Sequence, residues 1–179
     1  MPVDETTTYL EMTAPSDLRP SRPVPAVTVE PTEPGSPLIV PVQVRIGEPY
    51  AWPSVFRTAQ EWAERLADPL RQYWLIRYDS ELAGALDVLR RPEGEVEITT
   101  FGLVPEYVGR GVGGYALTVA VREAWNVEPL GADTVRRVWL HTSSLDHPNA
   151  LGNYQRRGFR AYRRVTGPSA RPPVTPPAH

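Results

Sequence analysis

Four glycines within six residues, at positions 109, 111, 113 and 114, constrain the fold of this chain most strongly. They stand in the segment Val108–Gly114, between a β-rich stretch and a stretch with apolar residues at helical spacing. Glycine adopts positive φ at little steric cost and lets a ligand approach the main chain closely. Free amides and the dipole at a helix start attract anions. We therefore expect a strand, a tight loop and a helix, with a diphosphate as the natural ligand and Arg110 able to pair with a phosphate.

Two common phosphate loops do not fit this segment. A P-loop needs a lysine after its glycines, and all 19 basic residues here are arginine, a bias that indicates a GC-rich bacterial genome. The dinucleotide fingerprint follows its strand directly inside a βαβ unit, whereas here Pro105-Glu106-Tyr107 intervenes after an antiparallel run. A third type of pyrophosphate loop remains, as does a tight strand-to-helix connection that binds nothing.

The surrounding pattern predicts a mixed sheet with helices on its faces, an α/β (α+β) domain. The expected strands are a short one at Thr8–Met12, then Leu38–Ile46, Tyr73–Tyr78, Ala83–Leu89, Glu95–Val104, Val135–Thr142 and Phe159–Val165. The expected helices cover Phe56–Leu66, Leu117–Trp125 and a stretch from Pro148 to Gly158.

Proline-rich ends divide the chain into three predicted segments. Residues 1–37 form an N-terminal segment that we expect to pack partly on the domain. Residues 38–166 form the domain itself. Residues 167–179 hold several prolines and no apolar cluster, which predicts a disordered tail.

Composition excludes several classes of function. The chain has no cysteine and only three histidines, which argues against disulfides and against a metal site. A formal net charge of −2 argues against nucleic-acid binding. No apolar run is long enough for a membrane span, and the first residues lack the pattern of a signal peptide. We therefore expect a cytoplasmic protein without metal, nucleic-acid or membrane partners.

Two signatures carry a family resemblance. The GNAT superfamily of N-acetyltransferases has a loop of the form Arg/Gln-x-x-Gly-x-Gly/Ala, which matches Val108, Gly111 and Gly113 except at its first position. The family also shows Asn-x-x-Ala, then Tyr, then Gly-Phe, each four residues apart. This chain has His147-Pro148-Asn149-Ala150, Tyr154 and Gly158-Phe159, with His147 in the place of the Asn. From Ala83 to Phe159 the chain therefore resembles the GNAT superfamily.

The resemblance implies a mostly antiparallel, twisted sheet in which the strand Glu95–Val104 carries a bulge and splays from the strand Val135–Thr142. Acetyl-CoA would be the acyl donor, held in that splay, and no metal would be needed. The residues implied in its binding are Phe101, Gly102, Leu103, Val108, Gly109, Arg110, Gly111, Val112, Gly113, Gly114, His147 and Asn149. A homodimer is common in the family.

The resemblance also implies catalytic roles. An alkyl amine arrives protonated, so a base must remove its proton, and the departing thiolate gains from an acid. Glu97 is the candidate base and Tyr154 the candidate acid, with His141 as an alternative base. Strand alternation places Glu97, Thr99 and Phe101 on one face and Val96, Ile98 and Thr100 on the other. Tyr50, Trp52 and His141 are the candidates for acceptor contacts.

The expected reaction is transfer of an acetyl group to a primary amine of a small molecule or peptide. Because the chain has no cysteine, the amine would attack directly in a ternary complex. Two alternatives stay open: transfer of a longer acyl group, and a non-catalytic acyl-CoA-binding or protein-interaction module.

Overall fold

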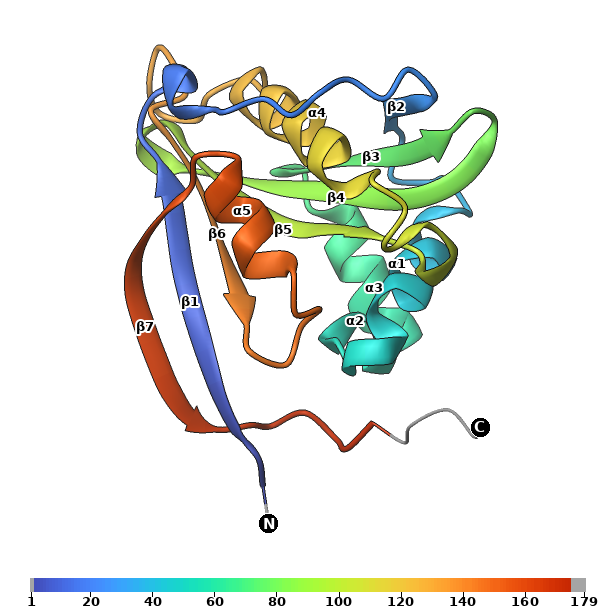
Figure 1. The fold of residues 1–179 in the computed structure, drawn as a ribbon. Coiled ribbons are helices and arrows are strands. Elements are labelled where there is room, and N and C mark those ends of the chain that lie inside the picture. The colour runs from blue at the N-terminus through green and yellow to red at the C-terminus, as the bar shows by residue number, and fades with distance from the viewer. Residues whose placement is uncertain (1, 175–179) are drawn as a thin grey trace.

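Seven strands build one mixed sheet in the order β2-β3-β4-β5-β6-β1-β7. A computed structural model describes residues 2–174 of the chain (Figure 1). All neighbouring strands are antiparallel except β5 and β6, which are parallel. The strands are β1 (Asp4–Met12), β2 (Val27–Thr32), β3 (Arg71–Tyr78), β4 (Glu81–Arg91), β5 (Glu95–Leu103), β6 (Arg137–Ser143) and β7 (Arg160–Pro168).

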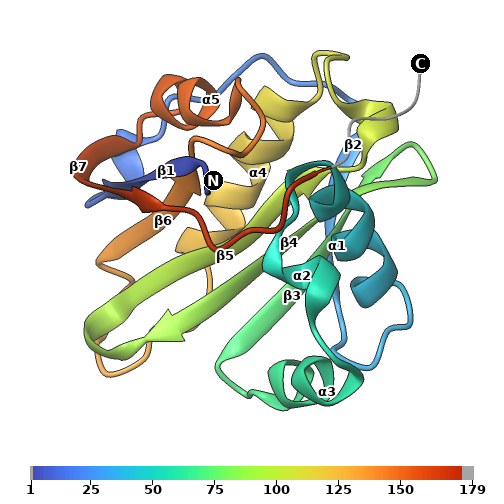
Figure 2. The same ribbon diagram turned by 90° about the horizontal axis from the view of Figure 1, so that it is seen from below.

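Helices cover both faces of the sheet. In Figure 1, α4 (Gly113–Trp125) lies above the sheet, and α1 (Ile39–Gly47), α2 (Pro53–Phe56) and α3 (Ala59–Ala67) lie below it. Figure 2 shows this lower layer in front, with α4 behind the strands and α5 (Ala150–Arg156) beside it at the top of the view. Short 3₁₀ turns occur at Pro15–Asp17, Glu48–Tyr50, Pro92–Gly94 and Pro105–Tyr107.

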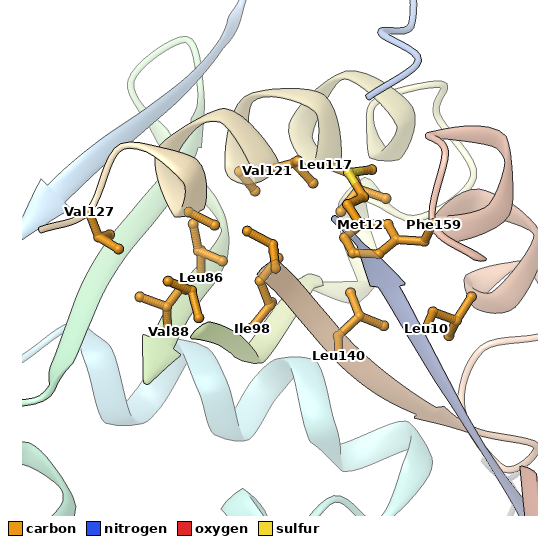
Figure 3. Packing of buried hydrophobic residues seen from close by; sticks show 14 of the residues in the cluster. Leu10, Met12, Leu86, Val88, Ile98, Leu117, Val121, Val127, Leu140 and Phe159 are labelled. Atoms are coloured by element: carbon orange, nitrogen blue, oxygen red, sulfur yellow. The ribbon is translucent and has the colours of Figure 1, made fainter. Parts of the chain in front are cut away.

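The larger core cluster lies between α4 and the sheet. Figure 3 shows Leu117 and Val121 of α4 above Ile98 of β5, with Leu140 of β6 and Leu10 of β1 farther along the sheet. Leu10 and Met12 are both 0% exposed, and β1 is paired on both sides, with β6 and with β7. The N-terminal segment therefore supplies an inner strand of the sheet.

One predicted strand is a helix. The segment Leu38–Ile46 was expected to be extended because it is rich in β-branched residues, but it forms α1. The buried side chains Ile39, Val42, Gln43 and Ile46 recur at helical spacing, so helical burial outweighs β propensity. Pro41 lies in the first turn of α1 and costs little helix stability, because the amide that proline lacks would have no partner within the helix there.

The two ends also differ from the prediction. β2 was not predicted, because it lies in the proline-rich stretch. It is an edge strand and pairs only with β3, and an edge position tolerates Pro31. At the other end, β7 continues to Pro168, and Arg171 forms ion pairs with Glu5 and Asp146. The predicted disordered tail thus begins too early, and its residues 175–179 lie outside the described residues.

A bulge in β5 interrupts the expected alternation. The pairing of β5 with β4 shifts between Asp87 and Val88, where Thr100 and Ile98 are the partners and Thr99 is the extra residue. Thr100 and Thr99 therefore both reach the buried pair formed by Gln43 and Asp87. The prediction that Thr100 faces away from Thr99 is wrong, because the bulge turns it to the same side.

The splay between β5 and β6 is confirmed. The two strands pair only at Glu95–Arg137, Val96–Val138 and Glu97–Trp139. Beyond Glu97, β5 keeps β4 as a partner on one side and opens toward a gap on the other. None of the helices within residues 2–174 combines the length and the hydrophobicity that a membrane-spanning segment needs.

Removing buried volume from β1 tests whether this strand is integral to the fold. We expect Leu10→Ala to lower the free energy of unfolding by about 2–5 kcal/mol, because it leaves a cavity in the core. Val165→Ala is the control, since Val165 lies on the edge strand β7 and is 44% exposed. Urea denaturation measures both. A loss in Leu10→Ala no larger than in Val165→Ala would contradict this role of β1.

Candidate active site

Two cavities meet at the β5–β6 gap. The first, the loop cavity, has a volume of about 330 Å³ and is lined by the glycine segment, the end of β5 and the start of α5. The second, the arginine cavity, has a volume of about 300 Å³ and is lined by five arginines and by Glu97 and Asp146 among other residues. Trp52, Phe101, Asp146 and Tyr154 line both cavities. A molecule in one cavity can therefore reach a molecule in the other at this shared wall.

The glycine segment has the backbone conformation that glycine favours. Gly109 has φ 77° and Gly111 has φ 75°, and a Cβ added at either would meet no atom within 4 Å. Glycine is needed there for its backbone angles rather than for lack of space. The α4 helix then begins at Gly113 without a side-chain cap, which leaves its first amides free for a ligand.

Ten of the twelve residues predicted to bind acyl-CoA line the loop cavity, and two do not. Arg110 lies over the rings of Tyr78 and Tyr107, at 5.6 and 5.0 Å from their centroids, and donates to the Glu106 carbonyl. Val112 is 2% exposed and packs in the core. The side chains of Arg110 and Val112 therefore do not face the cavity.

Sequence reasoning missed the cations that do face it. Arg156 and Arg157 of the α5 end both line the loop cavity. Nη1 of Arg157 lies 3.2 Å from the place of a Gly114 Cβ, and its buried Nε has no hydrogen-bond partner among the described residues. Asn153, also in the lining, donates to the Gly113 carbonyl over 3.3 Å. In the sequence, the only sign that Asn153, Arg156 and Arg157 lie at the cavity is that they are within three residues of Tyr154 on one short helix.

The end of β5 contributes a free backbone edge. Phe101, Gly102 and Leu103 pair with β4 on one side only and line the loop cavity on the other. The backbone is packed closely here, because a Cβ on Gly102 would lie 2.4 Å from Ile46 and one on Gly84 would lie 2.2 Å from the Gly102 carbonyl oxygen. Unpaired groups of this kind can pair with an extended chain of amides.

Tyr154 stands where the two cavities meet. Its ring makes edge contacts with Phe101 and Phe159, with centroids 6.4 and 6.0 Å apart. Burial, and in second place the negative charge of Asp146, raises the pKa of the Tyr154 phenol well above its ordinary value. The phenol therefore keeps its proton at neutral pH and can act as a donor.

Glu97 lies in the arginine cavity, with its side chain 8% exposed. Nε and Nη2 of Arg91 donate to its Oε1 at 2.9 and 2.5 Å. The carboxylate is thus oriented at the last paired position of β5, where the gap opens. His141 also lines this cavity, is exposed, and has its ring 5.5 Å from that of Tyr9.

Asp146 connects the elements around the shared wall. It accepts hydrogen bonds from the Trp52 indole at 2.9 Å, from Thr142 at 3.0 Å and from the Ser143 amide at 2.8 Å. Arg171 adds an ion pair at 2.9 Å. With four donors around it, this carboxylate is a positioning group.

The remaining predicted contacts divide between the cavities. Trp52 lines both, whereas Tyr50 lines the loop cavity, outside the predicted acceptor side. His147 accepts from the Asn149 amide at 3.1 Å and has Tyr50 at its edge, with centroids 6.3 Å apart. His147 and Asn149 both line the loop cavity.

Within residues 2–174 no group of three or more His, Cys, Asp or Glu side chains could hold a metal ion.

Solved structures share this fold. A GCN5-related N-acetyltransferase from Sphaerobacter thermophilus superposes with a TM-score of 0.63 at 18% identity, over 93% of this chain and 51% of that one. A putative GNAT acetyltransferase from Novosphingobium aromaticivorans gives 0.52 at 21% identity, over 94% and 66%. The putative acetyltransferase YycN from Bacillus subtilis gives 0.56 at 18% identity, over 76% and 94%.

A Staphylococcus epidermidis protein of unknown function also matches, with a TM-score of 0.61 at 15% identity, over 92% of this chain and 60% of that one. The chain thus spans about half to three fifths of the length of the Sphaerobacter and Staphylococcus proteins. At these identities the likeness shows the fold.

Sequence comparison shows the family. No curated protein sequence matches the chain significantly. The family description "Acetyltransferase (GNAT) family" matches residues 42–159, which is more than half of the chain and includes the glycine segment, β5 and Tyr154. This chain belongs to the GNAT acetyltransferase family.

Proposed function

We propose that the chain transfers an acetyl group from acetyl-CoA to a primary amine of a small molecule or peptide, by direct attack in a ternary complex. The observation that carries the proposal is the meeting of two cavities at Tyr154, one on each side of a shared wall. A donor and an acceptor can enter from different sides and react at that wall. Two alternatives are transfer of a longer acyl group and a non-catalytic acyl-CoA-binding or interaction module. A homodimer stays a prediction.

The loop cavity fits the pyrophosphate and pantetheine of an acyl-CoA. The free amides of Gly113 and Gly114 would bind the pyrophosphate, and Arg157 supplies a positive charge beside them. The open edge at Phe101–Leu103 would pair with the pantetheine amides. The thioester would then lie near Tyr154.

The proposed reaction removes two protons from the acceptor nitrogen and delivers one to the departing thiolate. Glu97, directly or through a water, takes a proton from the ammonium of the acceptor. The free amine attacks the thioester carbonyl, and backbone amides near Leu103 stabilise the oxyanion. The C–N bond forms as the C–S bond breaks, and the Tyr154 hydroxyl donates its proton to the departing thiolate. The newly bonded nitrogen releases its second proton to solvent, Glu97 later releases the first, and solvent returns a proton to Tyr154.

The loop assignment is tested by calorimetric titration with acetyl-CoA, CoA and a longer acyl-CoA. We expect Gly111→Ala to weaken acetyl-CoA binding about tenfold. The reason is that alanine at positive φ raises the free energy of the loop conformation that binds the ligand by about 1–2 kcal/mol. Gly35→Ala is the matched control, since Gly35 has open space and no positive φ. If none of the three compounds binds the wild type, the acyl-CoA proposal fails. Tighter binding of the longer acyl-CoA would favour the first alternative.

Tyr154→Phe tests the proposed acid. In a screen of primary amines that follows CoA release, we expect this variant to lower kcat by about 10²–10⁴-fold and to leave acetyl-CoA affinity within a few-fold of wild type. The reason is that only the proton donor is removed, while the aromatic ring remains. An unchanged kcat would rule out Tyr154 as the acid. Acetyl-CoA binding without turnover of any amine would favour the non-catalytic alternative.

Glu97→Gln and His141→Gln separate the two candidate bases. With the best amine from that screen, we expect Glu97→Gln to lower kcat by about 10²–10⁴-fold and His141→Gln to change it by less than about threefold. Thermal melts of both variants control for loss of the Arg91 ion pair. The opposite ranking would assign the base to His141.

A further inference from the structure

One wall of the arginine cavity is built by α2, α3 and β3, and three arginines lie in it. We call it the arginine wall. Arg57 follows α2 directly, Arg65 lies in the last turn of α3, and Arg71 begins β3. All three line the cavity. Figure 2 shows α2 and α3 on the side of the sheet opposite α5, which carries Tyr154.

The positive charge of this wall is only partly balanced. Arg65 lies 3.6 Å from Asp87, a carboxylate that also accepts from Gln43 and Thr99, and Arg71 lies 3.6 Å from Asp68. Arg57 stacks on Trp62, with its Cζ 4.8 Å from the ring centroid, and forms no ion pair with any described residue. Nη1 of Arg57 and Nε of Arg65 are buried and have no hydrogen-bond partner among residues 2–174.

Such an arrangement costs free energy in the free protein. Buried polar groups normally have partners, and like charges in close proximity repel. Burial, and in second place Arg65, lowers the pKa of Arg57 to about 10, so the guanidinium still carries its charge at neutral pH. An oxyanion of a bound molecule would give these donors their missing acceptors. The planar fork of arginine matches carboxylate and phosphate oxygens in particular.

We infer that the amine acceptor carries an anionic oxygen group, a carboxylate or a phosphate, which binds Arg57, Arg65 and Arg71 while the amine points toward Glu97 and Tyr154. The inference rests on the proposed function, because it names the class of acceptor for the same site. The volume of about 300 Å³ suits an acceptor of the size of an amino acid or a short peptide end.

Matched pairs of small amines test this inference without turnover. The probes are β-alanine against β-alaninamide and phosphoethanolamine against ethanolamine, titrated into the free protein and followed by tryptophan fluorescence. Trp52 lines the cavity and Trp62 lies beneath Arg57, so both can report binding. The variants are Arg57→Gln, Arg57→Lys and the control Arg122→Gln, which removes the charge of an exposed arginine on α4.

We expect each anionic probe to bind roughly tenfold to a hundredfold more tightly than its neutral partner. Arg57→Gln should remove most of this preference, Arg57→Lys should keep part of it, and Arg122→Gln should keep all of it. A preference for β-alanine would identify a carboxylate, and one for phosphoethanolamine a phosphate. If Arg57→Gln does not fold, Arg57→Lys is still expected to weaken the tighter anionic probe about threefold or more, since it loses the fork.

Equal affinities within both pairs, or no saturable binding of either anionic probe, would overturn the inference. So would an unchanged preference in Arg57→Gln or, if that variant does not fold, in Arg57→Lys. These titrations are independent of the acetyl-CoA calorimetry. If acetyl-CoA does not bind, the proposed transferase function is wrong. If only the preference for anionic probes is absent, the transferase proposal stands and only the anionic class of acceptor is wrong.

Discussion

The parallel pairing of β5 and β6 lasts for three residue pairs, and the candidate site depends on its early end. A full ladder would occupy both edges of β5 and close the gap between the cavities. Because pairing stops at Glu97, the backbone from Ile98 to Leu103 has β4 on one side and open space on the other. The bulge at Thr99 sits within this stretch, and a bulge locally bends the strand that carries it. Gly84 and Gly102 then allow β4, β5 and α1 to pack closely enough to hold the bend.

Asp146 fixes the far side of the gap. It lies in the turn after β6 and connects that strand to Trp52 near α2 and to Arg171 beyond β7. Arg171 also pairs with Glu5 of β1 at 3.1 Å. Segments from both ends of the chain are therefore joined beside Tyr154. After burial, the same carboxylate is the second cause of the raised pKa of that phenol, so the group that orders the site also favours the protonated form of the proposed acid.

Local patterns predicted the parts of the fold that depend on near neighbours. The strands β3 to β5 and the helix α4 follow from periodicity, and Gly109 and Gly111 use the backbone freedom expected of the glycine segment. The segment of α1 is rich in β-branched residues and so resembles a strand, although its buried residues have helical spacing. The face of Thr100 could not be predicted, since a bulge depends on the register with a neighbouring strand.

The site shows the same division. Tyr154, Glu97 and most of the loop were identified from motifs with fixed spacing, and they line the two cavities. The position of Arg110 among the glycines predicts a phosphate contact, but its guanidinium stacks on two tyrosines instead. Arg57, Arg65 and Arg71 come from three elements, and only the packing of α2 and α3 under the sheet brings them to one wall. No short pattern in the sequence encodes that meeting.

The arginine wall also bears on the proposed chemistry. An ammonium bound near several guanidinium groups is destabilised relative to the neutral amine, so the pKa of the bound amine should fall. Removal of that proton by Glu97, whose carboxylate Arg91 holds in place through two hydrogen bonds, would then be easier. A cationic amine without an anionic group would be repelled by the arginines, so it would not bind in the cavity and its pKa would not be lowered. An anionic group on the acceptor resolves the conflict, because its attraction to the wall offsets the repulsion of the amine. The charge pattern thus favours the binding and the deprotonation of an acceptor that carries both groups.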